Sequence, residues 1–245
     1  MPTARPTVAV VTRQPYAQGD NSSMGTLYLV RHGQASFGSD DYDRLSELGA
    51  RQCERLGTYF RQRGVRFDGV ITGTLRRHVQ SLEALSRGLQ AQHEALAMPG
   101  LNEYDSTAVV RTVHPQPLQR ARNPDEVRQH FRLLRQGLIA WMEGRVQPEG
   151  MPSFERFAAG VVEALDHVRT RHSGEVLIVS SGGPISTAVA HVLDAPPQAM
   201  VELNLRMRNS ALTEFAFTPK RHALITFNTL PHLEGADYAD WVTHT

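Results

Sequence analysis

TLYLVRHG, residues 26–33, begins as a run of strand-forming residues and ends in an arginine, a histidine and a glycine. The aromatic and apolar side chains over residues 26–30 predict a short strand. In open parallel sheets, ligands bind at the carboxyl ends of the strands. Arg31, His32 and Gly33 are therefore expected at the border of a ligand site.

The segments that follow alternate between helix and strand patterns. Ser46 is a typical N-cap, and Gly64 is typical of the position just past a helix end, with apolar residues at helical spacing between them. Residues 68–72 predict a second strand, and residues 75–85 carry apolar side chains at helical spacing again. Helices long enough to cross between strands predict a mostly parallel sheet in a three-layer α/β/α sandwich.

The second half of the chain holds an insertion and then returns to the same alternation. Residues 105–152 contain five prolines and one amphipathic helix, which predicts a cap insertion packed over the sheet. A continuous apolar run over residues 176–179 is typical of a buried parallel strand. The other elements expected are helices over 154–168 and 185–193 and closing strands over 212–217 and 223–227.

Length and composition bound the class of protein. The 245 residues, 40% of them hydrophobic, predict a single domain over residues 24–245 after a flexible N-terminal tail at 1–23. A net charge of +1 argues against a nucleic-acid partner, and the single cysteine rules out an internal disulfide framework. No run of 18 apolar residues and no signal-peptide core are present, so a cytoplasmic protein without membrane contact is expected.

The residues at the end of the first strand carry chemistry. Arg31 offers a planar fork that matches phosphate oxygens, His32 can act as a nucleophile or acid–base group, and Gly33 lets the backbone approach a ligand. A strand end with a solvated Arg–His pair is the alternative interpretation. Because 25 of the 26 basic residues are arginine, one arginine alone is weak evidence for anion binding.

Five ordered motifs strengthen the functional interpretation. They are residues 29–34 (LVRHGQ), residues 43–49 (DRLSELG) with Gln52, residues 73–77 (GTLRR) with Ser81, residues 101–103 (LNE) and residues 179–185 (VSSGGPI). Together these motifs resemble the histidine phosphatase superfamily, the family of cofactor-dependent phosphoglycerate mutases and related phosphatases. The resemblance covers residues 26–233 and is weakest across the insertion.

The resemblance implies a role for each site residue. His32 matches the histidine that becomes phosphorylated, and Glu103 matches the proton donor to the leaving oxygen. The phosphate-binding positions are matched by Arg31 and Arg77, with Ser181 and Gly182 at the end of the later strand. Neither a cofactor nor a metal is implied, and the expected ligand is a small phosphorylated substrate.

One departure from the family pattern bears on activity. Ser181 stands where the family has its second pocket histidine, and a charged hydrogen bond from an imidazolium is about twice as strong as a neutral one. His78 follows Arg77 directly, and neighbouring helix positions differ by about 100°, so His78 is expected to point away from the pocket. His114, His130 and His232 are further candidates, each more often a surface or capping histidine.

The other departures concern the reaction type. Gly38 stands where many members have a phosphate-contacting Asn, Gln34 replaces a more usual acidic residue, and the segment after Glu103 lacks a Gly-x-Trp-Glu-like continuation. These differences favour a phosphatase over a glycolytic mutase.

The sequence thus predicts a phosphomonoester hydrolase that acts through a phosphohistidine at His32. A mutase-type phosphotransferase and a catalytically impaired phosphate-ligand binder remain as alternatives, the second because of Ser181. An imidazole within reach of the Arg31, His32 and Arg77 pocket would favour the enzyme, and its absence would favour the binder. A homodimer is left open.

Overall fold

The computed structural model describes residues 24–36, 43–118 and 123–244. The tail predicted at residues 1–23 and the Gly38 position lie outside the described residues.

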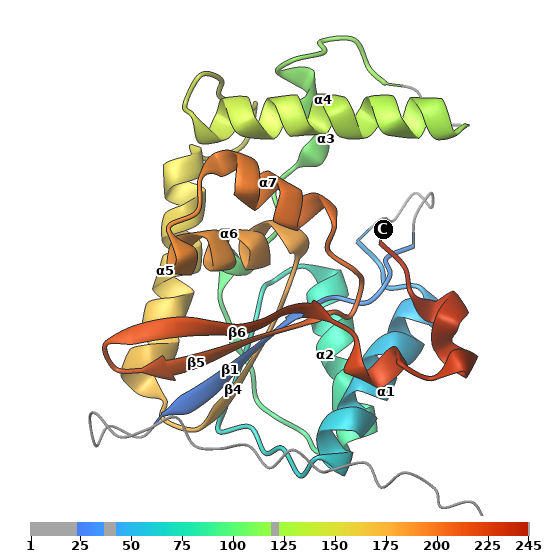
Figure 1. Cartoon of the computed structure of the whole chain (residues 1–245), viewed down its shortest axis with the longest axis vertical. Helices are drawn as coiled ribbons and strands as arrows, with labels where there is room; N and C mark the ends of the chain where they lie inside the picture. Colours follow the sequence, from blue (N-terminus) through green and yellow to red (C-terminus); the bar gives the residue numbers. More distant parts are fainter. Residues whose placement is uncertain (1–23, 37–42, 119–122, 245) are drawn as a thin grey trace, which may run out of the picture.

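A single mixed sheet forms the centre of the molecule (Figure 1). Its strand order is β3-β2-β4-β1-β5-β6. The four strands from β3 to β1 are parallel, whereas β5 runs antiparallel to β1 and to β6. The strands span Gly25–Arg31 (β1), Gly69–Thr72 (β2), Leu96–Ala97 (β3), Glu175–Ser180 (β4), Leu212–Thr218 (β5) and Arg221–Thr229 (β6).

Helices cover both faces of this sheet. Side chains of β1 alternate between two cores, because successive residues of a strand point to opposite faces. Tyr28 and Val30 pack with α1 (Glu47–Gln62) and α2 (Arg76–Leu89). Leu27 and Leu29 pack in the opposite core with α5 (Phe154–Arg171) and α6 (Gly182–Leu193). The predicted three-layer α/β/α sandwich is confirmed.

The predicted ends of α1 are also confirmed. The Ser46 hydroxyl accepts a hydrogen bond of 3.0 Å from the Gly49 N–H, which satisfies one of the unpaired donors of the first turn. Gly64 has a φ of +68°, a conformation that glycine adopts without steric cost.

A smaller core lies beyond the α6 side of the sheet. It is formed by α3 (Ser106–Arg111), α4 (Pro124–Met142) and α7 (Pro197–Leu205), with Trp141 fully buried at its centre. In Figure 1, α4 lies across the end of the molecule above α7. The sequence indicated one helix between residues 105 and 152 and none at 197–205. The extra helices, α3 and α7, were missed because six to nine residues show little periodicity.

The C-terminal segment packs back onto α1. It contains two short 3₁₀ helices, η2 (Pro231–Leu233) and η3 (Ala236–Trp241). The Arg51 guanidinium lies 5.1 Å from the centre of the Trp241 ring, and that of Arg55 lies 5.0 Å from the centre of the Tyr238 ring. These contacts place both aromatic rings against the protein itself. A homodimer stays a prediction.

Along the described residues, no helix combines the length and the apolar character needed to cross a membrane.

Candidate active site

The site lies where three neighbouring strands end at the same edge of the sheet. Arg31 of β1 pairs with Ser180 of β4, so the residues that follow, His32 and Ser181, leave the sheet side by side. Next to β4, β2 ends at Thr72 and leads through Gly73 into the first turn of α2. Parallel pairing therefore assembles segments that are far apart in the sequence.

His32 is buried and its tautomer follows from its hydrogen bond. Its Nδ1 lies 2.7 Å from the Gly33 carbonyl oxygen, which can only accept, so Nδ1 carries the hydrogen. Burial, and then the charges of Arg31 and Arg77, hold the pKa of His32 well below its usual value. The imidazole is consequently neutral, and Nε2 carries a lone pair.

The backbone on both sides of His32 is held in place. The His32 N–H donates to the Ser180 carbonyl oxygen at 2.8 Å, and its carbonyl oxygen accepts from the Ser210 N–H at 3.1 Å. The Gly33 N–H donates to the Ser81 hydroxyl at 3.1 Å. A Cβ at Gly33 would lie 2.3 Å from the Gly49 carbonyl oxygen, so this position requires glycine. The nucleophile candidate therefore sits on a fixed turn.

Two arginines flank the imidazole. Arg31 donates through Nη1 to the carbonyl oxygens of Met207 and, at 2.8 Å, of His244. Arg77, 7% exposed, donates through Nη1 to a carboxylate oxygen of Asp43 at 2.8 Å. The two guanidinium groups concentrate positive charge next to a neutral ring, which suits a dianionic ligand.

Glu103 reaches the same region from the segment after β3. Its carboxylate oxygens accept from the Gly183 N–H at 3.1 and 3.2 Å. A Cβ at Gly182 would lie 3.8 Å from a Glu103 oxygen and 3.9 Å from Arg31 Nε, which places all three residues together. Burial raises the pKa of Glu103. The hydrogen bond from the Gly183 N–H and the charges of Arg77 and Arg31 act the other way, but the net shift is upward. The Gly183 N–H, in the first turn of α6, is thus directed to Glu103.

The expectation for His78 was wrong. The His78 ring is fully buried, its centre lies 5.8 Å from that of His32, and its Nε2 lies 2.7 Å from Ser181 Oγ. Arg77 and His78, consecutive residues at the start of α2, therefore both lie near His32. Gly73 provides the space, since a Cβ there would lie 2.2 Å from His78 Nδ1.

The other histidines have different surroundings. His232 is buried and its Nε2 lies 2.9 Å from the hydroxyl of Ser210, the residue whose N–H holds the His32 carbonyl. His114 donates through Nδ1 to the Gln116 carbonyl oxygen at 2.9 Å, and His130 stacks edge-on against its neighbour Phe131. Among the described residues, no hydrogen bond or ring contact joins His114 or His130 to the His32 cluster.

Asp43 is the second residue that the sequence did not assign. Besides holding Arg77, its carboxylate accepts from the Arg76 N–H at 2.9 Å, at the start of α2. Asp43 lies in one of the ordered motifs, so its position carried a signal, but nothing in that motif indicated which arginine it would face.

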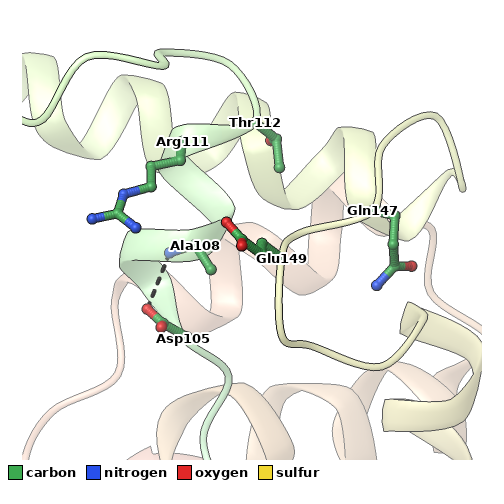
Figure 2. A pocket seen from close by; sticks show the side chains of 6 residues that line it. All are labelled: Asp105, Ala108, Arg111, Thr112, Gln147 and Glu149. Atoms are coloured by element: carbon green, nitrogen blue, oxygen red, sulfur yellow. Dashed lines mark hydrogen bonds between the residues drawn. The ribbon is translucent and has the colours of Figure 1, made fainter.

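A separate cavity of about 420 Å³ lies beside α3 (Figure 2). Its lining shares no residue with the His32 cluster, and the Asp105 carboxylate that faces it caps α3 by accepting from the Ala108 N–H at 3.0 Å. The cavity lining is Asp105, Ala108, Arg111, Thr112, Gln147 and Glu149.

No group of three or more metal-ligating side chains occurs among residues 24–36, 43–118 and 123–244.

Comparison with known proteins identifies a family. A family model for the histidine phosphatase superfamily (branch 1) matches residues 27–230. Broad-specificity phosphatase YOR283W of Saccharomyces cerevisiae is 32% identical over 69 residues. That match spans 25% of this chain and 30% of the yeast protein, so less than a third of the curated relative is covered.

Solved structures share the fold at low sequence identity. Phosphoglycerate mutase from Bacillus anthracis str. Sterne has a TM-score of 0.62 at 16% identity, over 86% of this chain and 96% of that one. Phosphoserine phosphatase from Entamoeba histolytica, in complex with 3-phosphoglyceric acid, has a TM-score of 0.60 at 17% identity, over 85% and 99%. Mycobacterial glucosyl-3-phosphoglycerate phosphatase Rv2419c has a TM-score of 0.58 at 19% identity, over 84% and 99%. These likenesses confirm the predicted phosphoglycerate mutase-like fold.

Proposed function

The chain belongs to the histidine phosphatase superfamily, and from this membership we propose that it is a phosphomonoester hydrolase acting through a phosphohistidine at His32. The observation that carries the proposal is the neutral His32 ring, with its lone pair on Nε2, beside the guanidinium groups of Arg31 and Arg77. Its substrate is a small phosphorylated molecule.

The first half-reaction transfers the phosphoryl group to the protein. The His32 Nε2 lone pair forms a bond to phosphorus while the bond from phosphorus to the ester oxygen breaks. The departing oxygen takes the proton of the Glu103 carboxyl, whose raised pKa favours the protonated form. Arg31 and Arg77 neutralise the charge on the phosphoryl oxygens, together with Ser181 and the Gly182 N–H at the start of α6.

The second half-reaction regenerates His32. A water oxygen bonds to phosphorus, the Glu103 carboxylate takes one water proton, and the phosphorus–nitrogen bond breaks to return its electron pair to Nε2. Inorganic phosphate then leaves. A hydroxyl group of a second molecule in place of water would give the phosphotransferase alternative with the same residues.

The impaired-binder alternative rests on Ser181 alone. It required a pocket without a second imidazole, and His78 supplies one at 2.7 Å from the Ser181 hydroxyl. This contact favours the enzyme.

The test of the proposal is hydrolysis of p-nitrophenyl phosphate with EDTA present. The proposed steps use only side chains, so we expect the purified protein to turn over this ester at the same rate before and after chelation. A rate that EDTA abolishes and a divalent cation restores would contradict the metal-independent mechanism. No turnover of any ester in a broad panel of phosphomonoesters would contradict the hydrolase.

The pH dependence of kcat/KM should follow from the two shifted groups. The reactive form has His32 neutral and Glu103 protonated. The pKa of His32 is lowered and that of Glu103 is raised, so this form is populated between the lowered pKa of His32 and the raised pKa of Glu103. With an alkyl phosphate, kcat/KM is expected to fall as the pH rises through the Glu103 pKa, and Glu103→Gln should remove this limb. A limb that persists in Glu103→Gln would assign it to another group, such as the substrate itself.

A further inference from the structure

We propose that Ser181 and His78 act as one unit in place of a second pocket imidazole, with Ser181 donating its hydroxyl hydrogen to the phosphoryl group and His78 positioning that hydroxyl. The inference rests on the proposed phosphoryl transfer to His32. Ser181 is in this scheme a catalytic residue, because it touches the reacting group. His78 is a positioning residue, because it acts through Ser181.

The pair is short, buried and next to the nucleophile. His78 Nε2 and Ser181 Oγ are 2.7 Å apart, and both residues have no exposed surface. Ser181 leaves β4 beside the point where His32 leaves β1, and the rings of His78 and His32 are 5.8 Å apart. With no water to compete, a hydrogen bond in this position is strong and directional.

The hydrogen count decides where the Ser181 hydrogen points. A serine hydroxyl has one hydrogen to donate and lone pairs to accept with. If His78 Nε2 carries a hydrogen, it donates to Oγ, and the serine hydrogen is then available to the pocket. If Nε2 carries none, the serine hydrogen is taken up by His78 and the pocket loses a donor. The state of one ring nitrogen therefore determines whether Ser181 can bind a phosphoryl oxygen.

The surroundings of the ring favour hydrogen on Nε2 when the ligand is present. His78 Nδ1 is buried against Gly73 and has no hydrogen-bond partner within the described part of the chain. A buried N–H without a partner is rarer in proteins than a buried acceptor without one, so the Nδ1 side is better left as a lone pair. A bound phosphoryl dianion adds an acceptor for the Ser181 hydrogen. His78 Nε2 then donates to Ser181 Oγ, and Ser181 donates to a phosphoryl oxygen.

The charges around His78 keep its ring neutral before a ligand binds. Burial and Arg77 lower its pKa to about 3, while Asp43 raises it, so the ring is neutral near pH 7 before ligand binds. The neighbouring His32 is neutral as well. The two negative charges of a bound phosphoryl group would oppose the lowering of the His78 pKa by Arg77. They would therefore favour a His78 ring that carries hydrogen on Nε2 and donates it to Ser181.

Activity measurements on single and double variants test whether Ser181 and His78 act as one unit or independently. We expect Ser181→Ala to lower kcat for p-nitrophenyl phosphate about 10²–10³-fold, the usual cost of losing one transition-state donor. His78→Ala should lower kcat about 10–10²-fold with little change in KM, because the hydroxyl remains but loses its direction. The double variant should resemble Ser181→Ala, since residues acting as a unit are not additive. Additive losses, or an unchanged kcat in folded His78→Ala, would overturn the inference.

Two further variants test whether the contribution of His78 is a hydrogen-bond donor to Ser181. His78→Gln can donate from an amide nitrogen and should retain more activity than His78→Ala. The combination His78→Ala with Ser181→His moves an imidazole to the Ser181 position and should recover at least tenfold over His78→Ala. His191→Ala, an exposed histidine near the far end of α6, is the matched control and should leave kcat unchanged. A His78→Gln variant no better than His78→Ala, and no recovery by the combination, would contradict the scheme.

A measurement on the unaltered protein covers the case in which buried variants do not fold. Long-range ¹H–¹⁵N spectra of the histidine rings, recorded with and without inorganic phosphate, report which ring nitrogen carries hydrogen. We expect hydrogen on His78 Nε2 in the phosphate complex, and an Nε2 without hydrogen in that complex would overturn the inference. Turnover that does not depend on His32 would instead contradict the proposed function, so the two failures are distinguishable.

Discussion

His32→Ala is expected to lower turnover of p-nitrophenyl phosphate by on the order of 10⁴-fold or more, the largest effect of any single substitution in this protein. Covalent catalysis replaces one difficult displacement by two easier ones, and removing the nucleophile removes both. Alanine removes the bond from Nδ1 to the Gly33 carbonyl oxygen but keeps the two backbone bonds that the His32 N–H and carbonyl groups make. The change therefore tests chemistry and leaves the fold in place.

The measurement pairs turnover with ligand binding. Affinity for inorganic phosphate, determined by calorimetry, should change far less than kcat because Arg31 and Arg77 remain. His191→Ala again serves as the histidine-to-alanine control. A His32→Ala protein that keeps more than a tenth of the normal turnover would refute a phosphohistidine intermediate, as would failure to trap an acid-labile phosphoenzyme in the unaltered protein.

Glu103→Gln should have the second largest effect, and its size should depend on the leaving group. A general acid contributes about 10²–10⁴-fold when the departing oxygen needs a proton. An alkyl phosphate has a basic leaving group, so we expect a loss in this range. The p-nitrophenolate group leaves without a proton, so turnover of its ester should fall less than tenfold at this step.

The glutamine variant preserves the geometry of the site. Its amide oxygen can still accept from the Gly183 N–H, which the carboxylate does at 3.1 Å. The ratio of the two substrate effects is the measurement, made at a pH where Glu103 is protonated in the unaltered protein. Equal losses for both esters would indicate that Glu103 orients the substrate and does not donate a proton.

Much of the architecture was predictable because its signals are local. The N-cap at Ser46, the left-handed turn at Gly64 and the apolar run of β4 each reflect a few neighbouring residues. The short helices α3 and α7 carried too few residues for a period to be seen. The two-residue strand β3 was missed for the same reason.

The candidate site was predictable only in part. The resemblance of ordered motifs indicated His32, Arg31, Arg77 and Glu103, and the structure brings these residues together. It did not indicate His78, because the helical angle between neighbours was applied as if the site lay along one face of α2. Arg77 and His78, at the beginning of that helix, both lie near His32.

The sequence by itself determined the layers of the fold, the strand that ends at Arg31 just before His32, and the family. These follow from periodicity, capping residues and motif order, which are properties of short stretches of chain. Only the tertiary structure decided that His78 meets Ser181, 103 residues away, and that the Gly183 N–H serves Glu103. Such contacts depend on which strands lie side by side and on the space left by Gly73, and neither is encoded within any single segment.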